Sequence, residues 1–252
     1  VTRTAFRNAA DEAAWLKVFY IDLIILPTVA LALYASYRGV SAMWKMMAEN
    51  TGVGQPLYRP SASQFIKEFL WPAIVEIVQH TRFKECKTNA DRLKGHLPLL
   101  LSFLALFFVT VYSAFTQDVI GIFVPSMHGP ISMWNPVKIL ANVAAIALIV
   151  GVGILWSNRA RKEAEGKATP TFYDWFLIWM IMGVGVTGLA AELFRLIGVV
   201  SVGYILYYLH LVSVMMLFLY MPYTKFAHLV YRTFAMAFER YRESAYVKNP
   251  LV

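Results

Sequence analysis

The sequence predicts an all-α fold class: an integral membrane bundle of five transmembrane helices with an interfacial amphipathic helix. Composition is the first reason, since 59% of the 252 residues are hydrophobic and only 15% are charged. Soluble domains average roughly 45–50% apolar and about 25% charged residues. The second reason is the presence of five long apolar segments, and the third is the alternation of charge between the loops that join them.

The five predicted spans are each long enough to cross the hydrocarbon core of a bilayer, which is about 30 Å thick. We expect residues 1–15 to form an N-terminal interfacial arm. Residues 16–235 form the five-span domain, including a long cytoplasmic segment at 38–94, and residues 236–252 form a cytoplasmic tail. The spans are predicted at 16–37, 97–116, 137–156, 172–196 and 199–221.

The charge of the loops predicts the orientation of the chain. Segment 38–94 holds nine Lys or Arg residues, loop 117–136 holds none, and loop 157–171 holds four. Because basic loops stay on the cytoplasmic side, we expect the N-terminus outside and the C-terminus in the cytoplasm, across the cytoplasmic (inner) membrane. The net charge of +8 would then meet anionic membrane lipid and an acidic partner protein, and no nucleic acid.

Residues 61–79, within the long cytoplasmic segment, have the pattern of an amphipathic helix. Lys67 and Glu68 fall on one side of it and six apolar residues fall on the other. A helix of this kind lies along the membrane surface with its apolar side toward lipid. We therefore expect a docking platform at the cytoplasmic face. The apolar residues are Phe65, Phe69, Leu70, Ile74, Ile77 and Val78.

Two histidines at the end of the last span carry the strongest functional signal. His210 lies inside the apolar run 199–221, where a polar side chain is costly and usually functional. His228 follows eighteen residues later, which is about five helical turns, so on one helix both imidazoles face the same side about 27 Å apart. This spacing predicts a helix that ligates two haems, one toward each side of the membrane. Pro222 lies between them and can kink the helix.

Two haems with two axial histidines each need four of the five histidines in the chain. His96, at the cytoplasmic end of the second span, and His80, after the amphipathic helix, complete the candidate set of haem-iron ligands. The simplest pairing joins His96 to His210 for the outer haem and His80 to His228 for the cytoplasmic one. The alternative joins His96 to His228 and leaves His210 to another partner or to none. His128, in the outer loop, suits ligation least.

Glu192 and Arg195 are two charged residues that stand out inside the span 172–196, near its outer end. One interpretation is a pair that neutralises itself between helices. The other is a site that handles protons or binds a quinone headgroup beside the outer haem, to which Asp22, near the outer end of the first span, could contribute. No residue is assigned a catalytic role, and no Walker, dinucleotide-binding or metalloprotease motif is present.

At these residues the sequence resembles the di-haem cytochrome b membrane subunits of the respiratory nitrate reductase gamma type. Phe83-Lys-Glu-Cys86, Arg92-x-x-x-His96 and Tyr223-Thr-Lys-Phe-Ala-His228 resemble more closely the membrane subunit of the quinone-interacting membrane-bound oxidoreductase of sulfate reducers. The resemblance implies haem b (two expected, one possible), menaquinone as substrate, and cytoplasmic flavin or iron–sulfur subunits as partners. It also implies a ferredoxin-like domain, which either lies upstream of Val1 or belongs to another chain.

The predicted function is therefore electron transfer between a membrane quinone and cytoplasmic redox subunits of a respiratory complex, of the sulfur-metabolism type by resemblance. His80 departs from the nitrate reductase pattern because it precedes the second span. The competing class is a haem-free membrane anchor, in which the histidines only form hydrogen bonds between helices. A small transporter lined by Glu192 and Arg195 is a third class, but it predicts inverted repeats, and the sequence shows none.

Overall fold

The computed structural model describes residues 2–50, 60–79, 90–124 and 131–248, and these ranges are mainly helical, with no strand among them. Five of the helices are long and apolar enough to cross a membrane, which confirms the predicted all-α bundle. They are α1 (Thr2–Asn50), α5 (Ala90–Ala114), α7 (Pro136–Ala164), α8 (Phe172–Leu196) and α9 (Val200–Tyr220).

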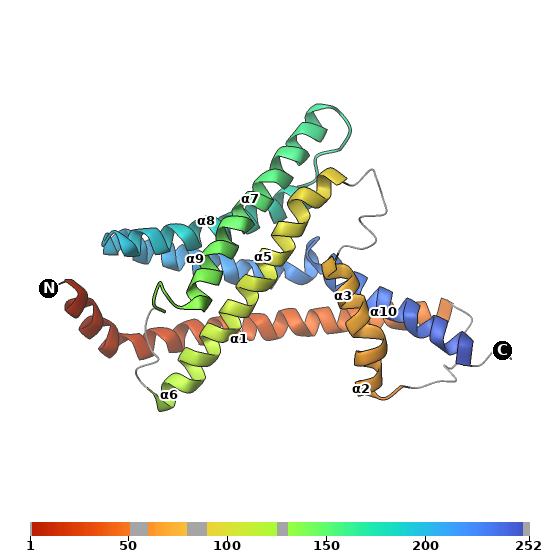
Figure 1. The fold of residues 1–252 in the computed structure, drawn as a ribbon, viewed down its shortest axis with the longest axis horizontal. Helices are drawn as coiled ribbons and strands as arrows, with labels where there is room; N and C mark the ends of the chain where they lie inside the picture. The colour runs from red at the N-terminus through yellow and green to blue at the C-terminus, as the bar shows by residue number, and fades with distance from the viewer. Residues whose placement is uncertain (1, 51–59, 80–89, 125–130, 249–252) are drawn as a thin grey trace.

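The helices pack in two groups that cross each other (Figure 1). Helix α5 packs chiefly against α7, α8 packs against α9, and α1 runs beside α9. Helix α7 also contacts α8 and so joins the two groups. Helix α10 (Ala227–Lys248) lies at the opposite end of the molecule from the start of α1. We call this the α10 end, and the opposite end, where α8 turns into α9, the Gly198 end.

Local signals at the helix ends explain how the chain reverses direction. The side chain of Asn135 accepts the backbone N–H of Val137 at 2.9 Å, which caps the start of α7. At the Gly198 end, α8 turns directly into α9 through Gly198, whose φ of 80° favours glycine. The tight turn makes α8 and α9 an antiparallel pair, which is the frame for the histidine in α9.

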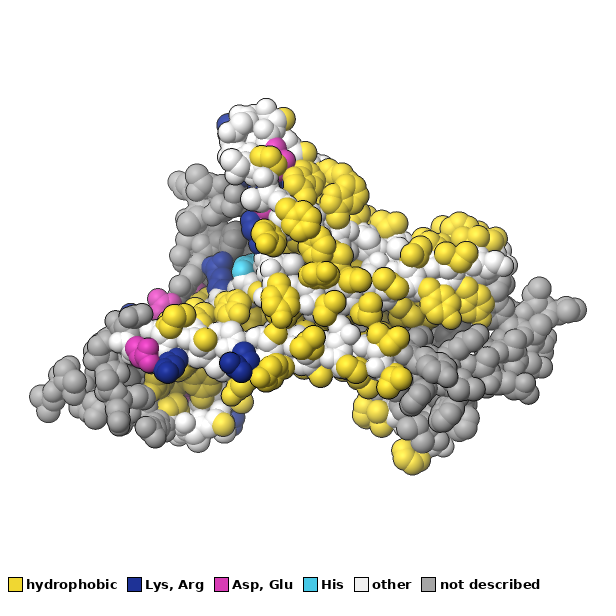
Figure 2. Space-filling model, turned by 180° about the vertical axis from the view of Figure 1, so that it is seen from behind, with side chains coloured by type: hydrophobic (Ala, Val, Ile, Leu, Met, Phe, Trp, Pro, Cys, Tyr) yellow, Lys and Arg dark blue, Asp and Glu magenta, His cyan; other side chains and the backbone are white. Residues whose placement is uncertain are grey.

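Large apolar side chains are exposed on every one of the five helices (Figure 2). Leaving such a side chain in water costs about 1.5–3 kcal/mol relative to burying it, whereas lipid removes this cost. The buried cluster between the spans is small, with Leu148 and Val152 of α7 against Ile181 of α8. The chain is therefore a multi-pass membrane protein. Examples of the exposed residues are Leu26, Phe107, Val143, Trp179 and Ile205.

The first helix is longer than its predicted span. It runs without a break from Thr2 to Asn50, so the backbone shows no boundary between the predicted arm at 1–15 and the span at 16–37. Its described apolar part is Leu23–Glu49. The second span is also extended, because a π-helical turn at Phe115–Ile120 continues α5 to Phe123.

The predicted amphipathic helix is present as α2 (Ala62–Phe65), a π-helical turn (Ile66–Leu70) and α3 (Trp71–Gln79). Ser61 and Gln64 form a reciprocal capping box at its start. Part of its apolar side packs on protein, because α10 and the end of α1 present a matching apolar surface. The buried core there comprises Phe69, Ala73, Met236, Ala237, Phe238 and Tyr241, with Trp44 and Phe65 packed against it.

One ion pair joins this segment to α10: Nη2 of Arg240 lies 2.7 Å from Oε2 of Glu76. Glu76→Gln removes the carboxylate charge of this ion pair, so we expect the free energy of unfolding to fall by about 1 kcal/mol. Thermal unfolding in detergent measures it. The matched control is Lys45→Gln, which breaks a more exposed pair of 3.8 Å with Glu49. Equal effects of the two variants would show that the Glu76 pair does not hold α3 to α10.

Candidate haem-ligand site

Three of the predicted ligands fall within the described residues, and the structure brings two of them together. The ring centroids of His96, in α5, and His228, in α10, are 6.5 Å apart, with an angle of 66° between the ring planes. Both residues lie at the α10 end. His80 and His128 lie outside the described residues. Of the two predicted pairings, the structure brings together the alternative pair, His96 with His228. Ligation of a haem by this pair stays a prediction.

The reason is a break in the last predicted span. Helix α9 ends at Tyr220, a short 3₁₀ turn covers Met221–Tyr223, and Thr224 is extended before α10 begins. The prediction of one helix carrying both His210 and His228 is therefore wrong. Pro222 has no backbone N–H and prevents the helix from continuing. The redirected chain places His228 beside α5 instead of along the axis of α9.

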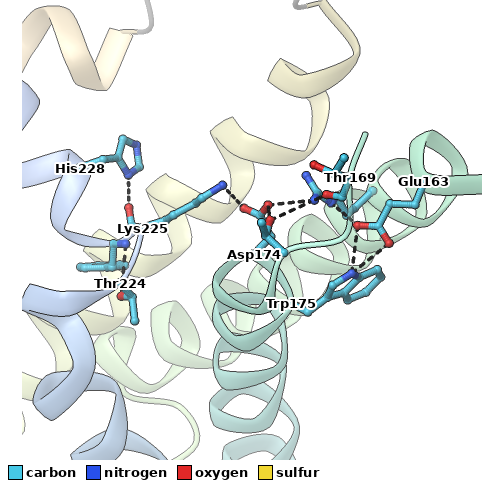
Figure 3. Close-up of polar contacts among 10 residues, drawn as sticks. Glu163, Thr169, Asp174, Trp175, Thr224, Lys225 and His228 are labelled. Atoms are coloured by element: carbon cyan, nitrogen blue, oxygen red, sulfur yellow. Dashed lines mark hydrogen bonds and ion pairs between the residues drawn. The ribbon is translucent and has the colours of Figure 1, made fainter. Parts of the chain in front are cut away.

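The imidazole of His228 is oriented by the turn before it. Its Nδ1–H donates to the backbone carbonyl of Lys225 (Figure 3). In the neutral ring this leaves the lone pair on Nε2. Metal-binding histidines usually have this arrangement, in which the second ring nitrogen donates to a carbonyl or carboxylate.

The separation of the two rings can be compared with what two axial ligands require. A metal–imidazole bond is about 2 Å, and each ring centroid lies about 1 Å beyond its nitrogen. Two imidazoles on opposite sides of one iron therefore have centroids about 6 Å apart. The observed 6.5 Å is close to this value. The chemistry of the donor set, two imidazoles from different helices at this separation, fits a haem.

His210 has different surroundings. Its Nδ1–H donates to the carbonyl of Val184 in α8 at 3.0 Å, and Oγ1 of Thr187 lies 3.3 Å from the same nitrogen. Gly188 makes room for the ring, because a Cβ there would lie 2.9 Å from Cε1 of His210. The histidine thus joins α9 to α8 by an interhelical hydrogen bond.

Glu192 lies in a three-residue ionic cluster at the Gly198 end. One oxygen accepts from Nη2 of Arg195 at 2.6 Å, and the other accepts from Nζ of Lys138 in α7 at 2.9 Å. The sequence predicts the Glu192–Arg195 pair but gives Lys138 no role beyond membership of a span. The place of Lys138 in the first turn of α7 is the signal that could have identified it. Asp22 lies in α1, and its side chain is outside the described residues.

A second ionic network, at the α10 end, is not predicted by the sequence. Asp174 in the first turn of α8 binds Arg159 of α7 at 2.9 Å and also binds Lys225 (Figure 3). From the sequence, Arg159 is used only as one of the basic loop residues that predict the orientation. Lys225 is used only as part of the stretch that ends at His228. The network ties the turn that carries His228 to α7 and α8.

The described residues contain no group of three or more His, Cys, Asp or Glu side chains that could hold a metal ion. A haem iron, however, takes four ligands from its macrocycle and needs only two from the protein. The pair His96 and His228 is therefore the candidate ligand set.

Residues 26–247 match the family model CitB, described as citrate utilization protein B. The chain belongs to the CitB family. The CitB match covers all of α5 to α9 and nearly all of α10, and so includes His96, His210 and His228. No curated protein and no solved structure matches the chain significantly.

Proposed function

We propose that this chain is a membrane haem b subunit that transfers electrons between a membrane quinone pool and cytoplasmic flavin or iron–sulfur subunits. The observation that carries the proposal is the pair His96 and His228, whose ring centroids lie 6.5 Å apart at one end of the bundle. The positive-inside rule makes the α10 end cytoplasmic. A site there is close to a soluble redox partner, and the N-terminus of the chain is outside.

His96 and His228 are the residues that would hold a haem here. Bound haem supplies reversible one-electron chemistry, with a potential set by its ligands and their hydrogen bonds. The protein positions the two imidazoles on separate helices, and the Lys225 carbonyl orients one of them. This supports one haem b. The second haem expected from the sequence requires another partner for His210. His80 stays a predicted ligand, and it lies outside the described residues.

The cluster of Lys138, Glu192 and Arg195 is the proposed quinone side of the subunit. Lys138 and Arg195 together have eight N–H donors, of which Glu192 takes three. Donors therefore remain for the carbonyl oxygen of a quinone headgroup, and Glu192 can accept a proton. The resemblance to quinone-linked cytochromes favours menaquinone. The cluster lies at the Gly198 end, which is the outer end in the proposed orientation.

The family description names citrate utilization, whereas the resemblance indicates sulfur metabolism. We therefore propose a flavin or iron–sulfur subunit as the cytoplasmic partner and assign it no substrate. The segment α2–α3 with α10 forms a packed unit at the same end as the histidine pair, which supports a docking role for this end.

The direct test is reduction of the purified protein by a menaquinol analogue in detergent. We expect a reduced-minus-oxidised spectrum with the sharp bands of low-spin haem b, formed by the quinol as well as by dithionite. If dithionite produces the bands and the quinol does not, the haem assignment stands and the quinone assignment is wrong.

Glu192→Gln tests the quinone side separately. Loss of the proton acceptor and of two ion pairs should slow quinol-driven reduction at least about tenfold, while the dithionite-reduced spectrum stays the same. Stopped-flow absorbance measures the rate. An unchanged rate would mean that Glu192 only ties α7 to α8.

The second candidate function is a haem-free membrane anchor. The observation that favours it is His210, whose ring nitrogen is satisfied by hydrogen bonding to α8. An anchor predicts that His96 and His228 are also structural, and that protein purified with its partners has no absorbance from haem.

A further inference from the structure

Lys225 connects the turn that carries His228 to α8. Lys225 pairs through Nζ with Oδ1 of Asp174, in the first turn of α8 (Figure 3). The backbone carbonyl of the same Lys225 accepts the Nδ1–H of His228. Lys225 therefore links the carboxylate of Asp174 with the imidazole of His228.

Asp174 is fixed from its other side as well. Nη2 of Arg159 lies 2.9 Å from Oδ2 of Asp174, and the hydroxyl of Thr171 donates to the same oxygen. Arg159 is itself held by Glu163 at 2.6 Å, and Glu163 accepts the indole N–H of Trp175 at 3.0 Å. The Asp174 side chain is only 14% exposed, so water and salt screen its ion pairs less than those of surface residues.

The turn needs such a restraint because it is not part of a helix. Thr224 is extended, with ψ near 176°, and α10 starts only at Ala227. The backbone hydrogen bonds across the turn, from Ala227 to Thr224 and from His228 to Lys225, are 3.0 and 3.3 Å long. The ion pair to Asp174 adds a long-range contact that sets where the Lys225 carbonyl lies relative to α8.

We propose that Asp174 is a positioning residue for the His228 ligand, acting through Lys225 to fix the direction of the His228 imidazole. The inference rests on the proposed function, because it takes His228 as a haem ligand. Groups that hold a ligating histidine from behind set its orientation and its basicity, and their loss typically weakens metal binding about 10–100-fold. Asp174 acts on His228 indirectly, through Lys225, whereas the Lys225 carbonyl contacts the imidazole itself. We therefore expect a loss of haem binding at the lower end of this range.

The experiment compares Asp174→Asn and Lys225→Met with the unaltered protein in detergent. The readouts are the electron paramagnetic resonance signal of the low-spin haem and the rate of haem transfer to excess apomyoglobin. Each variant should release haem about tenfold faster and shift the low-spin signal. The double variant should be no worse than either single one, because both remove the same link. Asp174→Glu keeps the charge, so its haem release and its low-spin signal should stay close to those of the unaltered protein.

Glu165→Gln is the matched control. Glu165 lies in the loop between α7 and α8 and pairs with Lys167 at 2.8 Å, and this pair does not involve the His228 turn. The hydrogen bond and charge of Lys167 lower the pKa of the Glu165 carboxyl, so the control also removes an ionised, paired carboxylate. It should leave both readouts unchanged.

The outcomes separate the inference from the function on which it rests. Unaltered protein without haem overturns the proposed function. Haem in the unaltered protein, with unchanged release and signal in both single variants, overturns the role of Asp174 alone. If Asp174→Asn does not assemble, Lys225→Met decides, because the Lys225 side chain is 55% exposed and its removal leaves the pair of Arg159 and Asp174 in place.

Discussion

Replacing His228 by alanine is expected to remove the low-spin haem signal from the α10 end of the bundle. His228 lies in the first turn of α10 and faces His96 across 6.5 Å between ring centroids. Without the His228 imidazole, only His96 of this pair would remain to hold a haem between α5 and α10. We expect haem content from this pair to fall at least about tenfold.

His96→Ala should have the same effect, because the two residues act as one ligand pair. His210→Ala is the comparison variant. Its hydrogen bond joins α9 to α8, so we expect it to lower stability by about 1 kcal/mol and to leave the haem of the His96–His228 pair in place. A haem content that falls in His210→Ala but not in His228→Ala would reverse the ligand assignment.

The second large effect is expected at Gly151 in α7, which packs against the backbone of α5. A Cβ on Gly151 would lie 3.0 Å from the backbone nitrogen of Leu99 and 3.1 Å from the carbonyl oxygen of Gly95. Backbone atoms cannot swing aside as side chains do, so Gly151→Val must push α5 away. Overpacking of this kind costs about 1–3 kcal/mol. It also moves His96, which follows Gly95, away from His228.

We therefore expect Gly151→Val to lower both the thermal stability and the haem content. Gly153 provides the control on the same helix, because a Cβ there would have no neighbouring atom within 4 Å. Gly153→Ala should be neutral in both measurements. A normal haem content in folded Gly151→Val would show that the spacing of α5 and α7 does not control the ligand pair.

The helices can be predicted from the sequence because their apolar length and flanking charges are local properties. The predicted span 199–221 ends within one residue of the observed end of α9. The break at Pro222, however, reads from the sequence only as a kink, because no local pattern shows that the chain changes direction before α10. Depth counted along one straight helix does not fix the partner of His96, whereas the observed fold places His228 near it. The sequence also does not predict what the apolar side of the amphipathic segment packs against, because that side suits lipid and α10 equally well.

The ionic contacts are harder to predict because their members are far apart in the chain. Asp174, Arg159 and Lys225 come from α8, α7 and the turn before α10, and no local pattern joins them. Lys138 and Glu192 are likewise brought together only by the packing of α7 on α8. The candidate ligands can be found from residue type and depth, whereas their pairing depends on the fold.

The most direct test of the central claim is a pyridine haemochrome assay on protein purified together with its partners. The pair His96 and His228 predicts about one haem b per chain, and about two would add a second site at His210. Protein that is folded and complete but contains no haem b would contradict the account and favour the membrane anchor.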